Sequence, residues 1–122
     1  MSEKKIVLAI DDSIQQLDEF KSMLTPEYDL RVVKSATEAI KYLNKSTADI
    51  ILLDIQMPNI NGYEFLSDIR RIPSHGKTPV IIVSGTISEA LSEKAMAIGA
   101  ANILHKPVGR DQLIEAIEKV FA

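Results

Sequence analysis

The chain has 122 residues, which fits one domain and predicts a single unit over residues 1–122 with no output domain. Its net charge of -3 and 46% hydrophobic content are those of an ordinary globular protein, without the strongly basic character that usually marks nucleic-acid binding. The lack of cysteine excludes disulfides and thiolate chemistry, and no apolar run approaches the ~20 residues of a membrane span. We therefore expect a cytoplasmic protein that contacts neither a membrane nor nucleic acid directly.

Five short runs rich in β-branched residues predict the strands of a sheet. Most of them are continuously apolar rather than alternating, which is typical of strands buried on both faces of a parallel sheet. In chain order the runs are 6–10, 30–33, 50–53, 80–83 and a weaker one at 102–104.

The segments that follow these runs repeat apolar residues at helical spacing. Ser35 with Glu38, and Asn61 with Glu64, follow the capping-box pattern that begins a helix. Gly99 stands where a left-handed residue would end one. The result is a (βα)5 arrangement of the α/β class, in which right-handed crossovers place helices on both faces of a parallel sheet.

Acidic residues stand at the carboxyl ends of two predicted strands. Asp11 and Asp12 follow the first strand and Asp54 the third, while Lys106 follows the fifth. Ligands of open α/β sheets bind outside this edge, so these side chains meet in one crevice if strands one and three are neighbours. Three carboxylates repel one another, and Lys106 offsets only one charge. A hard divalent cation would offset more, and oxygen ligands favour Mg2+, for which Mn2+ can substitute.

A carboxylate in such a site can attack phosphorus and form an acyl phosphate. Phosphoryl transfer needs in-line positioning and positive charge near the equatorial oxygens, which Mg2+ and Lys106 would supply. Ser84 and Gly85 end the fourth strand. The Ser84 hydroxyl can donate to a phosphoryl oxygen, and Gly85 leaves room for the group because it has no side chain.

Four sequence elements, taken with their order and spacing, resemble the receiver domain of two-component response regulators over essentially the whole chain. The matching segments are 10–13 (IDDS), 53–62 (LDIQMPNING), 83–85 (VSG), and the pairs at 99–100 and 106–107. The resemblance implies a doubly wound, flavodoxin-like fold with strand order 2-1-3-4-5. It also implies a phosphoacceptor that receives its phosphoryl group from a sensor histidine kinase or a histidine phosphotransfer protein, and then switches binding to an unknown downstream protein target.

The resemblance assigns roles to the acidic residues. Asp54 looks like the phosphorylated aspartate. Asp12 looks like a direct Mg2+ ligand and Asp11 like a ligand that works largely through water. The main-chain carbonyl of Gln56 looks like a further ligand.

Further roles follow from the same resemblance. Ser84, with Gly85 and Thr86 as neighbours, would bind the phosphoryl group, and Ser84 would move toward it. Lys106 would pair first with Asp54 and then with the phosphoryl group, and the Lys106–Pro107 bond is expected to be cis. Gln56 and Thr86 would border the path of the water that hydrolyses the acyl phosphate.

Other functions fit the same residues less well. A structural module with this fold would not need the intact set Asp12, Asp54, Ser84 and Lys106. A haloacid-dehalogenase-like phosphatase would carry its aspartyl nucleophile in an Asp-x-Asp pattern after the first strand, whereas here the acids are adjacent. A flavodoxin-type cofactor binder must accept phosphate at its first loop, where Asp11 and Asp12 would repel it unless a cation intervenes. A P-loop nucleotidase needs a Gly-rich loop, which this sequence lacks. We therefore expect no enzymatic activity beyond self-phosphorylation and autodephosphorylation.

The chain departs from the family at Ile103, where many receivers carry Tyr or Phe three residues before the lysine. Isoleucine is stiff at χ1 and lacks a hydroxyl, so a rotamer switch of the aromatic kind is not expected. Two alternatives stay open. A signal can travel through the loop after Ser84 and the next helix, or Ile103 can belong to an apolar patch that contacts a partner.

Four other residues receive structural rather than chemical interpretations. His75 is interpreted as a solvated loop residue, and His105 as a strand residue that points away from Lys106. Met57, with Pro58, is interpreted as a loop anchor.

Overall fold

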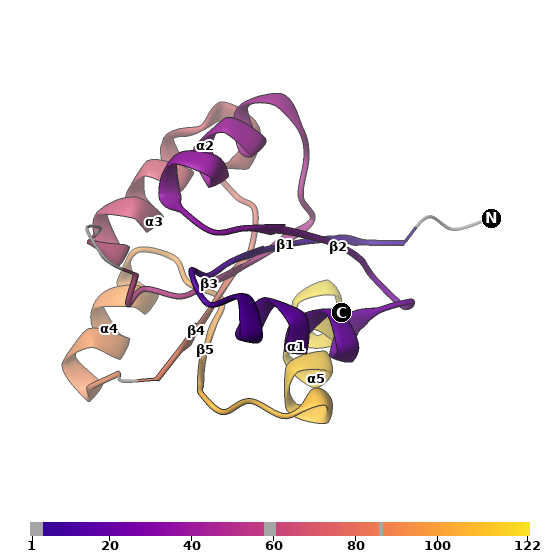
Figure 1. Cartoon of the computed structure of the whole chain (residues 1–122). Coiled ribbons are helices and arrows are strands. Elements are labelled where there is room, and N and C mark those ends of the chain that lie inside the picture. Colours follow the sequence, from indigo (N-terminus) through magenta and orange to yellow (C-terminus); the bar gives the residue numbers. More distant parts are fainter. Residues whose placement is uncertain (1–3, 58–60, 86) are drawn as a thin grey trace.

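The structure is a computed structural model, and it describes residues 4–57, 61–85 and 87–122. Within these residues five strands alternate with five α-helices, as Figure 1 shows. None of the described helices is long and apolar enough to cross a membrane. In chain order the elements are β1 (Ile6–Ile10), α1 (Ile14–Leu24), β2 (Asp29–Val33), α2 (Ala36–Lys45), β3 (Ile50–Leu53), α3 (Gly62–Arg71), the short 3-10 helix η1 (Pro73–His75), β4 (Val80–Ser84), α4 (Glu89–Ala97), β5 (Asn102–His105) and α5 (Arg110–Phe121).

The five strands form one parallel sheet in the order β2-β1-β3-β4-β5. This confirms the predicted doubly wound, flavodoxin-like fold. In the centre of the sheet, Ala9 of β1 pairs with Val32 of β2 on one side and Leu52 of β3 on the other. Because all strands run the same way, their carboxyl ends lie at a single edge, where the loops after β1, β3, β4 and β5 meet.

Two apolar clusters fill the space between the sheet and its helices. Leu8 and Ile10 of β1 point to one face, where α2, α3 and α4 cover the sheet. Val7 and Ala9 point to the other face, which α1 and α5 cover (Figure 1). All four of these β1 side chains are buried. Burial on both faces explains why the strands are continuously apolar in sequence.

The helix ends lie where the sequence placed them. The Ser35 hydroxyl accepts a hydrogen bond from the main-chain N–H three residues later, at 3.1 Å. Asn61 Oδ1 accepts from the N–H groups of Tyr63 and Glu64, at 3.0 and 3.4 Å. Gly99 has a φ of 104°, the left-handed conformation expected of a helix stop. Local capping chemistry was therefore a sufficient guide to these three ends.

The interpretation of His75 as a solvated loop residue is wrong. Only 1% of its surface is exposed, because η1 folds the ring back against the end of α2. Its Nδ1 lies 2.9 Å from the Thr78 hydroxyl, and its Nε2 lies 3.3 Å from the Ser46 carbonyl oxygen. His105 is exposed on β5, as expected of a strand residue that points away from the site.

Candidate functional site

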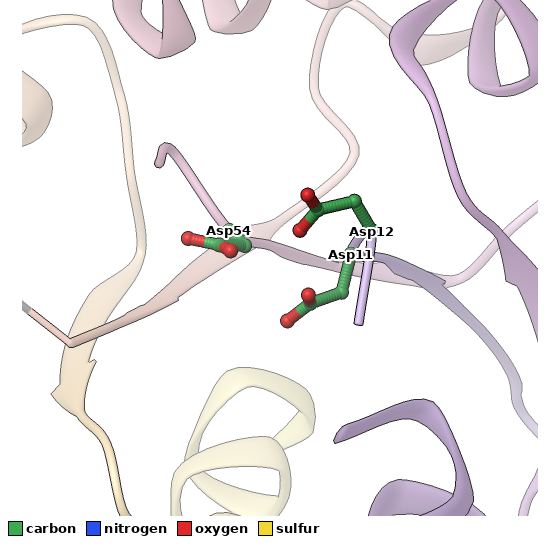
Figure 2. Close-up of side chains that lie close together, drawn as sticks. All are labelled: Asp11, Asp12 and Asp54. Carbon is green, nitrogen blue, oxygen red and sulfur yellow. The ribbon is translucent and has the colours of Figure 1, made fainter. Parts of the chain in front are cut away.

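Three carboxylates gather at the carboxyl edge of the sheet. Asp11 and Asp12 follow β1, and Asp54 follows β3, which pairs directly with β1. Each offers an oxygen, and these oxygens all lie within 4.8 Å of one another (Figure 2). Asp11 and Asp54 are buried, with 1% and 5% of their surfaces exposed, whereas Asp12 is exposed. The structure thus brings together the three acids that the sequence singled out.

Local hydrogen bonds orient the two buried carboxylates. Oδ1 of Asp11 accepts from the main-chain N–H of Ser13, at 2.9 Å, and Ser13 in turn caps the start of α1. Oδ1 of Asp54 accepts from the main-chain N–H of Gln56, at 2.9 Å. Each acid therefore has one oxygen held by its own loop, while its second oxygen turns toward Lys106.

Lys106 bridges the two buried acids from the end of β5. Its Nζ lies 2.8 Å from Asp11 Oδ2 and 3.3 Å from Asp54 Oδ2. Its main-chain N–H donates to the Ser84 carbonyl oxygen, at 2.9 Å, which holds the lysine beside β4. The Lys106–Pro107 bond is cis, which confirms that expectation. The contact with Asp54 was expected, whereas the shorter one with Asp11 was not.

Burial and charge pairing both act on the pKa values of the site. Burial raises the pKa of Asp11 above its ordinary value, even though the hydrogen bond from Lys106 opposes the shift. Burial would lower the pKa of Lys106, but the hydrogen bond and charge of Asp11, together with those of Asp54, outweigh it and raise the value. One ammonium shared by two buried carboxylates leaves the site negative, and such a site favours a bound cation.

The Ser84 hydroxyl is fully buried and donates to Oε1 of Gln56, at 3.0 Å. The sequence predicted that this hydroxyl donates to a phosphoryl oxygen, and in this structure its acceptor is the Gln56 carboxamide. A Cβ added at Gly85 would lie 3.6 Å from the same oxygen, so the Gln56 side chain lies across the corner that Ser84 and Gly85 form. Thr86, the other predicted neighbour of the phosphoryl group, lies outside the described residues.

The loop after Asp54 is held close to the core. Met57 is 6% exposed and packs in the cluster beneath α2, α3 and α4, which confirms it as an anchor; Pro58 lies outside the described residues. Gly62 begins α3 against the main chain of Ile55, and an added Cβ there would lie 2.7 Å from the Ile55 Cα. A glycine is therefore required at this position because no side chain fits.

Ile103 is half-buried on β5 and pairs with Ile82 of β4. Its side chain packs against the cluster beneath α2, α3 and α4. This position is compatible with both proposed roles, a link in the route through α4 and a part of a partner-binding patch.

A model of the response regulator receiver domain matches residues 7–118. The chain belongs to the response regulator receiver domain family. It is a phosphoacceptor signalling domain of two-component signal transduction, as the resemblance implied. The family implies a phosphodonor protein and a downstream target, and it generally uses Mg2+.

Curated relatives of this receiver domain are longer proteins. It is 36% identical to a protein-glutamate methylesterase/protein-glutamine glutaminase of Myxococcus xanthus, over 88% of this chain and 32% of that protein. It is 30% identical to the 3',5'-cyclic-nucleotide phosphodiesterase regA of Dictyostelium discoideum, over 98% of this chain and 16% of that protein. The chain thus spans a third or less of the length of these two relatives.

Solved structures of similar size match the receiver domain along nearly its whole length. The chemotaxis protein CheY4 of Vibrio cholerae superposes with a TM-score of 0.91 at 27% identity, covering 97% of this chain and 99% of that one. A CheY-like receiver domain of Methanospirillum hungatei superposes with a TM-score of 0.89, also at 27% identity, covering 97% and 94%.

Proposed function

We propose that Asp54 is the residue that accepts the phosphoryl group. The observation that carries this proposal is its position at the end of β3, where one oxygen is held by Gln56 and the other lies 3.3 Å from Lys106. A carboxylate oxygen of Asp54 forms a bond to phosphorus while the bond between phosphorus and the donor's leaving group breaks. The electron pair of that broken bond stays with the donor. Lys106 is placed to offset the negative charge that the group brings.

Asp11 and Asp12 are proposed to hold the Mg2+ ion, together with Asp54 and the main-chain carbonyl of Gln56. The donor set fits this ion, because it consists of oxygens and its net charge is negative. Bound Mg2+ would supply positive charge for the phosphoryl oxygens. Asp12 is the exposed member of the three, so it can ligate an ion without further burial of charge.

Ser84 and Gly85 are proposed to receive the phosphoryl group on the side of Asp54 that faces β4. Ser84 ends β4 with its hydroxyl buried, and Gly85 adds no side chain to the corner beside it. The sequence-based role of Thr86 stays a prediction.

The proposed partners follow from this chemistry. A histidine kinase or a histidine phosphotransfer protein would supply the phosphoryl group, and a protein target would bind one state of the domain in preference to the other. The domain's own chemistry would be limited to its phosphorylation and to hydrolysis of the acyl phosphate. Within a longer chain, the same switch would act on an attached domain.

Intact-mass measurement of the purified chain tests the assignment of Asp54. Incubation with Mg2+ and acetyl phosphate is expected to add one phosphoryl group to the wild-type chain, and addition of EDTA is expected to prevent it. Asp54→Asn removes the nucleophile but keeps the shape of the side chain, so it should remain unmodified. The assignment fails if the wild type stays unmodified or if Asp54→Asn takes up an equal phosphoryl group.

A further inference from the structure

The buried hydroxyl of Ser84 already has an acceptor in this structure. Its only proton is directed to Oε1 of Gln56, at 3.0 Å. Ser84 is completely buried, whereas Gln56, which accepts its hydrogen bond, is an exposed residue. A phosphoryl oxygen that approaches Ser84 from Asp54 must replace Gln56 Oε1 as the acceptor of this hydrogen bond.

The main chain fixes Gln56 in place for this contact. Its N–H donates to Asp54 Oδ1, at 2.9 Å, which ties the residue to the proposed phosphoacceptor. From this point the side chain reaches back to Ser84, and its Oε1 lies 3.6 Å from where a Cβ of Gly85 would be. A side chain at this position would therefore be in van der Waals contact with the carboxamide.

We propose that the Gln56 carboxamide is a latch on Ser84, which competes with the phosphoryl group for the hydroxyl proton. The latch rests on the proposed function of Asp54 and adds a positioning residue to it. Gln56 acts through Ser84 rather than on phosphorus. In the unphosphorylated state it satisfies a hydroxyl that would otherwise be buried without an acceptor. Phosphorylation exchanges one acceptor of the Ser84 hydroxyl for another.

A consequence is that the hydrogen bond between Gln56 and Ser84 opposes binding of a phosphoryl group. Removing the carboxamide should therefore tighten binding of a phosphoryl mimic by roughly 2- to 10-fold, the equilibrium factor that corresponds to one neutral hydrogen bond. The effect should require Ser84, because Gln56 acts only through that hydroxyl.

Titration with beryllofluoride in the presence of Mg2+ tests this coupling, with bound ligand followed by fluorine NMR. Four proteins are compared: the wild type, Gln56→Met, Ser84→Ala and the double variant. Methionine keeps the length of the side chain but offers no strong acceptor. We expect Gln56→Met to tighten binding in the wild-type background and to leave it unchanged in the Ser84→Ala background. Gln56→Ala should tighten binding in the same direction.

The following results would overturn the latch. Binding that weakens in Gln56→Met, or that does not change, shows that the carboxamide does not compete for the proton. Equal tightening in both backgrounds shows that Gln56 acts without Ser84. Absence of beryllofluoride binding in the wild type contradicts the proposed function itself, and the latch with it. If all four proteins bind beryllofluoride but the cycle shows no coupling between Gln56 and Ser84, the latch is contradicted and the proposed function is not.

Discussion

Two buried carboxylates, those of Asp11 and Asp54, share one ammonium group in the described part of the chain. Lys106 is closer to Asp11, at 2.8 Å, than to Asp54, at 3.3 Å. The pKa of Asp11 is nevertheless raised by burial. Ionised Asp11 is therefore less stable in the folded protein than in water, which is the usual consequence of keeping charged groups in a functional site.

Asp11→Asn is expected to stabilise the metal-free protein. Because its pKa is raised, folded Asp11 holds its proton more tightly than the unfolded chain does. The stability linked to that proton is fully present below the ordinary pKa of 3.8 and is lost as the pH rises through the folded value. The Asn side chain of the variant stays uncharged, so the variant does not lose this stability as the pH rises. Its free energy of unfolding should therefore exceed that of the wild type by about 1 kcal/mol at neutral pH. Urea denaturation in EDTA measures the difference.

The pH dependence provides the control. The advantage of Asp11→Asn should shrink as the pH falls toward 3.8, where wild-type Asp11 becomes neutral as well. Lys106→Met should change stability in the opposite direction, because it leaves two buried acids without their shared cation. A less stable Asp11→Asn variant at neutral pH would contradict this account.

The helices α3 and α4 meet around Tyr63. Its ring lies 5.0 Å from the Nζ of Lys94, and its hydroxyl is buried without a hydrogen-bond partner among the described residues. An unsatisfied buried hydroxyl opposes folding.

Tyr63→Phe is therefore expected to raise the free energy of unfolding by about 1 kcal/mol. Tyr42→Phe is a matched control, because the Tyr42 hydroxyl donates to the Thr47 carbonyl oxygen, at 2.9 Å. That change should lower the free energy of unfolding by about 0.5 to 1 kcal/mol. Urea denaturation of both variants measures the contrast, and a loss of stability in Tyr63→Phe would show that its hydroxyl is satisfied.

His75 joins the end of α2 to the turn before β4, through Ser46 and Thr78. His75→Ala should lower the free energy of unfolding by about 3 kcal/mol, because it opens a cavity and breaks both hydrogen bonds. The exposed His105 offers a control of the same residue type, and His105→Ala should change stability by no more than about 0.5 kcal/mol. Thermal or urea denaturation measures both.

A phosphorylation assay of His75→Ala distinguishes a structural role of His75 from a role in the chemistry of the site. The residue precedes β4, whereas the proposed site lies after that strand, at the opposite edge of the sheet. The folded His75→Ala variant should therefore accept a phosphoryl group as the wild type does. Loss of phosphorylation in a variant that remains folded would place His75 in the chemistry.

Mg2+ is expected to stabilise the entire fold. An ion that binds only the folded chain adds about 2.7 kcal/mol to the free energy of unfolding at a concentration of about 100 times its Kd. The site makes this gain possible because it brings Asp54 beside the adjacent pair Asp11 and Asp12, from which it is distant in the unfolded chain. Thermal denaturation with Mg2+ and with EDTA measures the shift.

Asp12→Asn separates the effect of the ion from that of the charge. Asp12 is exposed, so the substitution should leave the stability in EDTA nearly unchanged. It should nevertheless reduce the gain from Mg2+, because it removes one proposed ligand. An Asp12→Asn variant with the full gain would remove Asp12 from the ligand set.

Much of the fold could be predicted from local sequence. Continuous apolar runs mark buried strands, and the caps at Ser35, Asn61 and Gly99 mark helix ends, because these signals depend on neighbours within a few residues. The ends of the strands can be predicted in the same way. Asp11, Asp54 and Lys106 could therefore be assigned to the carboxyl edge of the sheet before any contact was known.

The contacts between these residues follow from the paths of separate loops. Lys106 meets Asp11 across 95 positions, and Ser84 meets Gln56 across 28. Neither pairing leaves a local pattern, because a strand end shows where a side chain begins but not which neighbour it will reach. The burial of His75 has the same origin, since η1 turns it toward a helix that ended 30 positions earlier, at Lys45. Asp54 was thus identifiable from the linear sequence, whereas the latch on Ser84 and the shared ammonium of Lys106 arise only when the sheet brings four loops together.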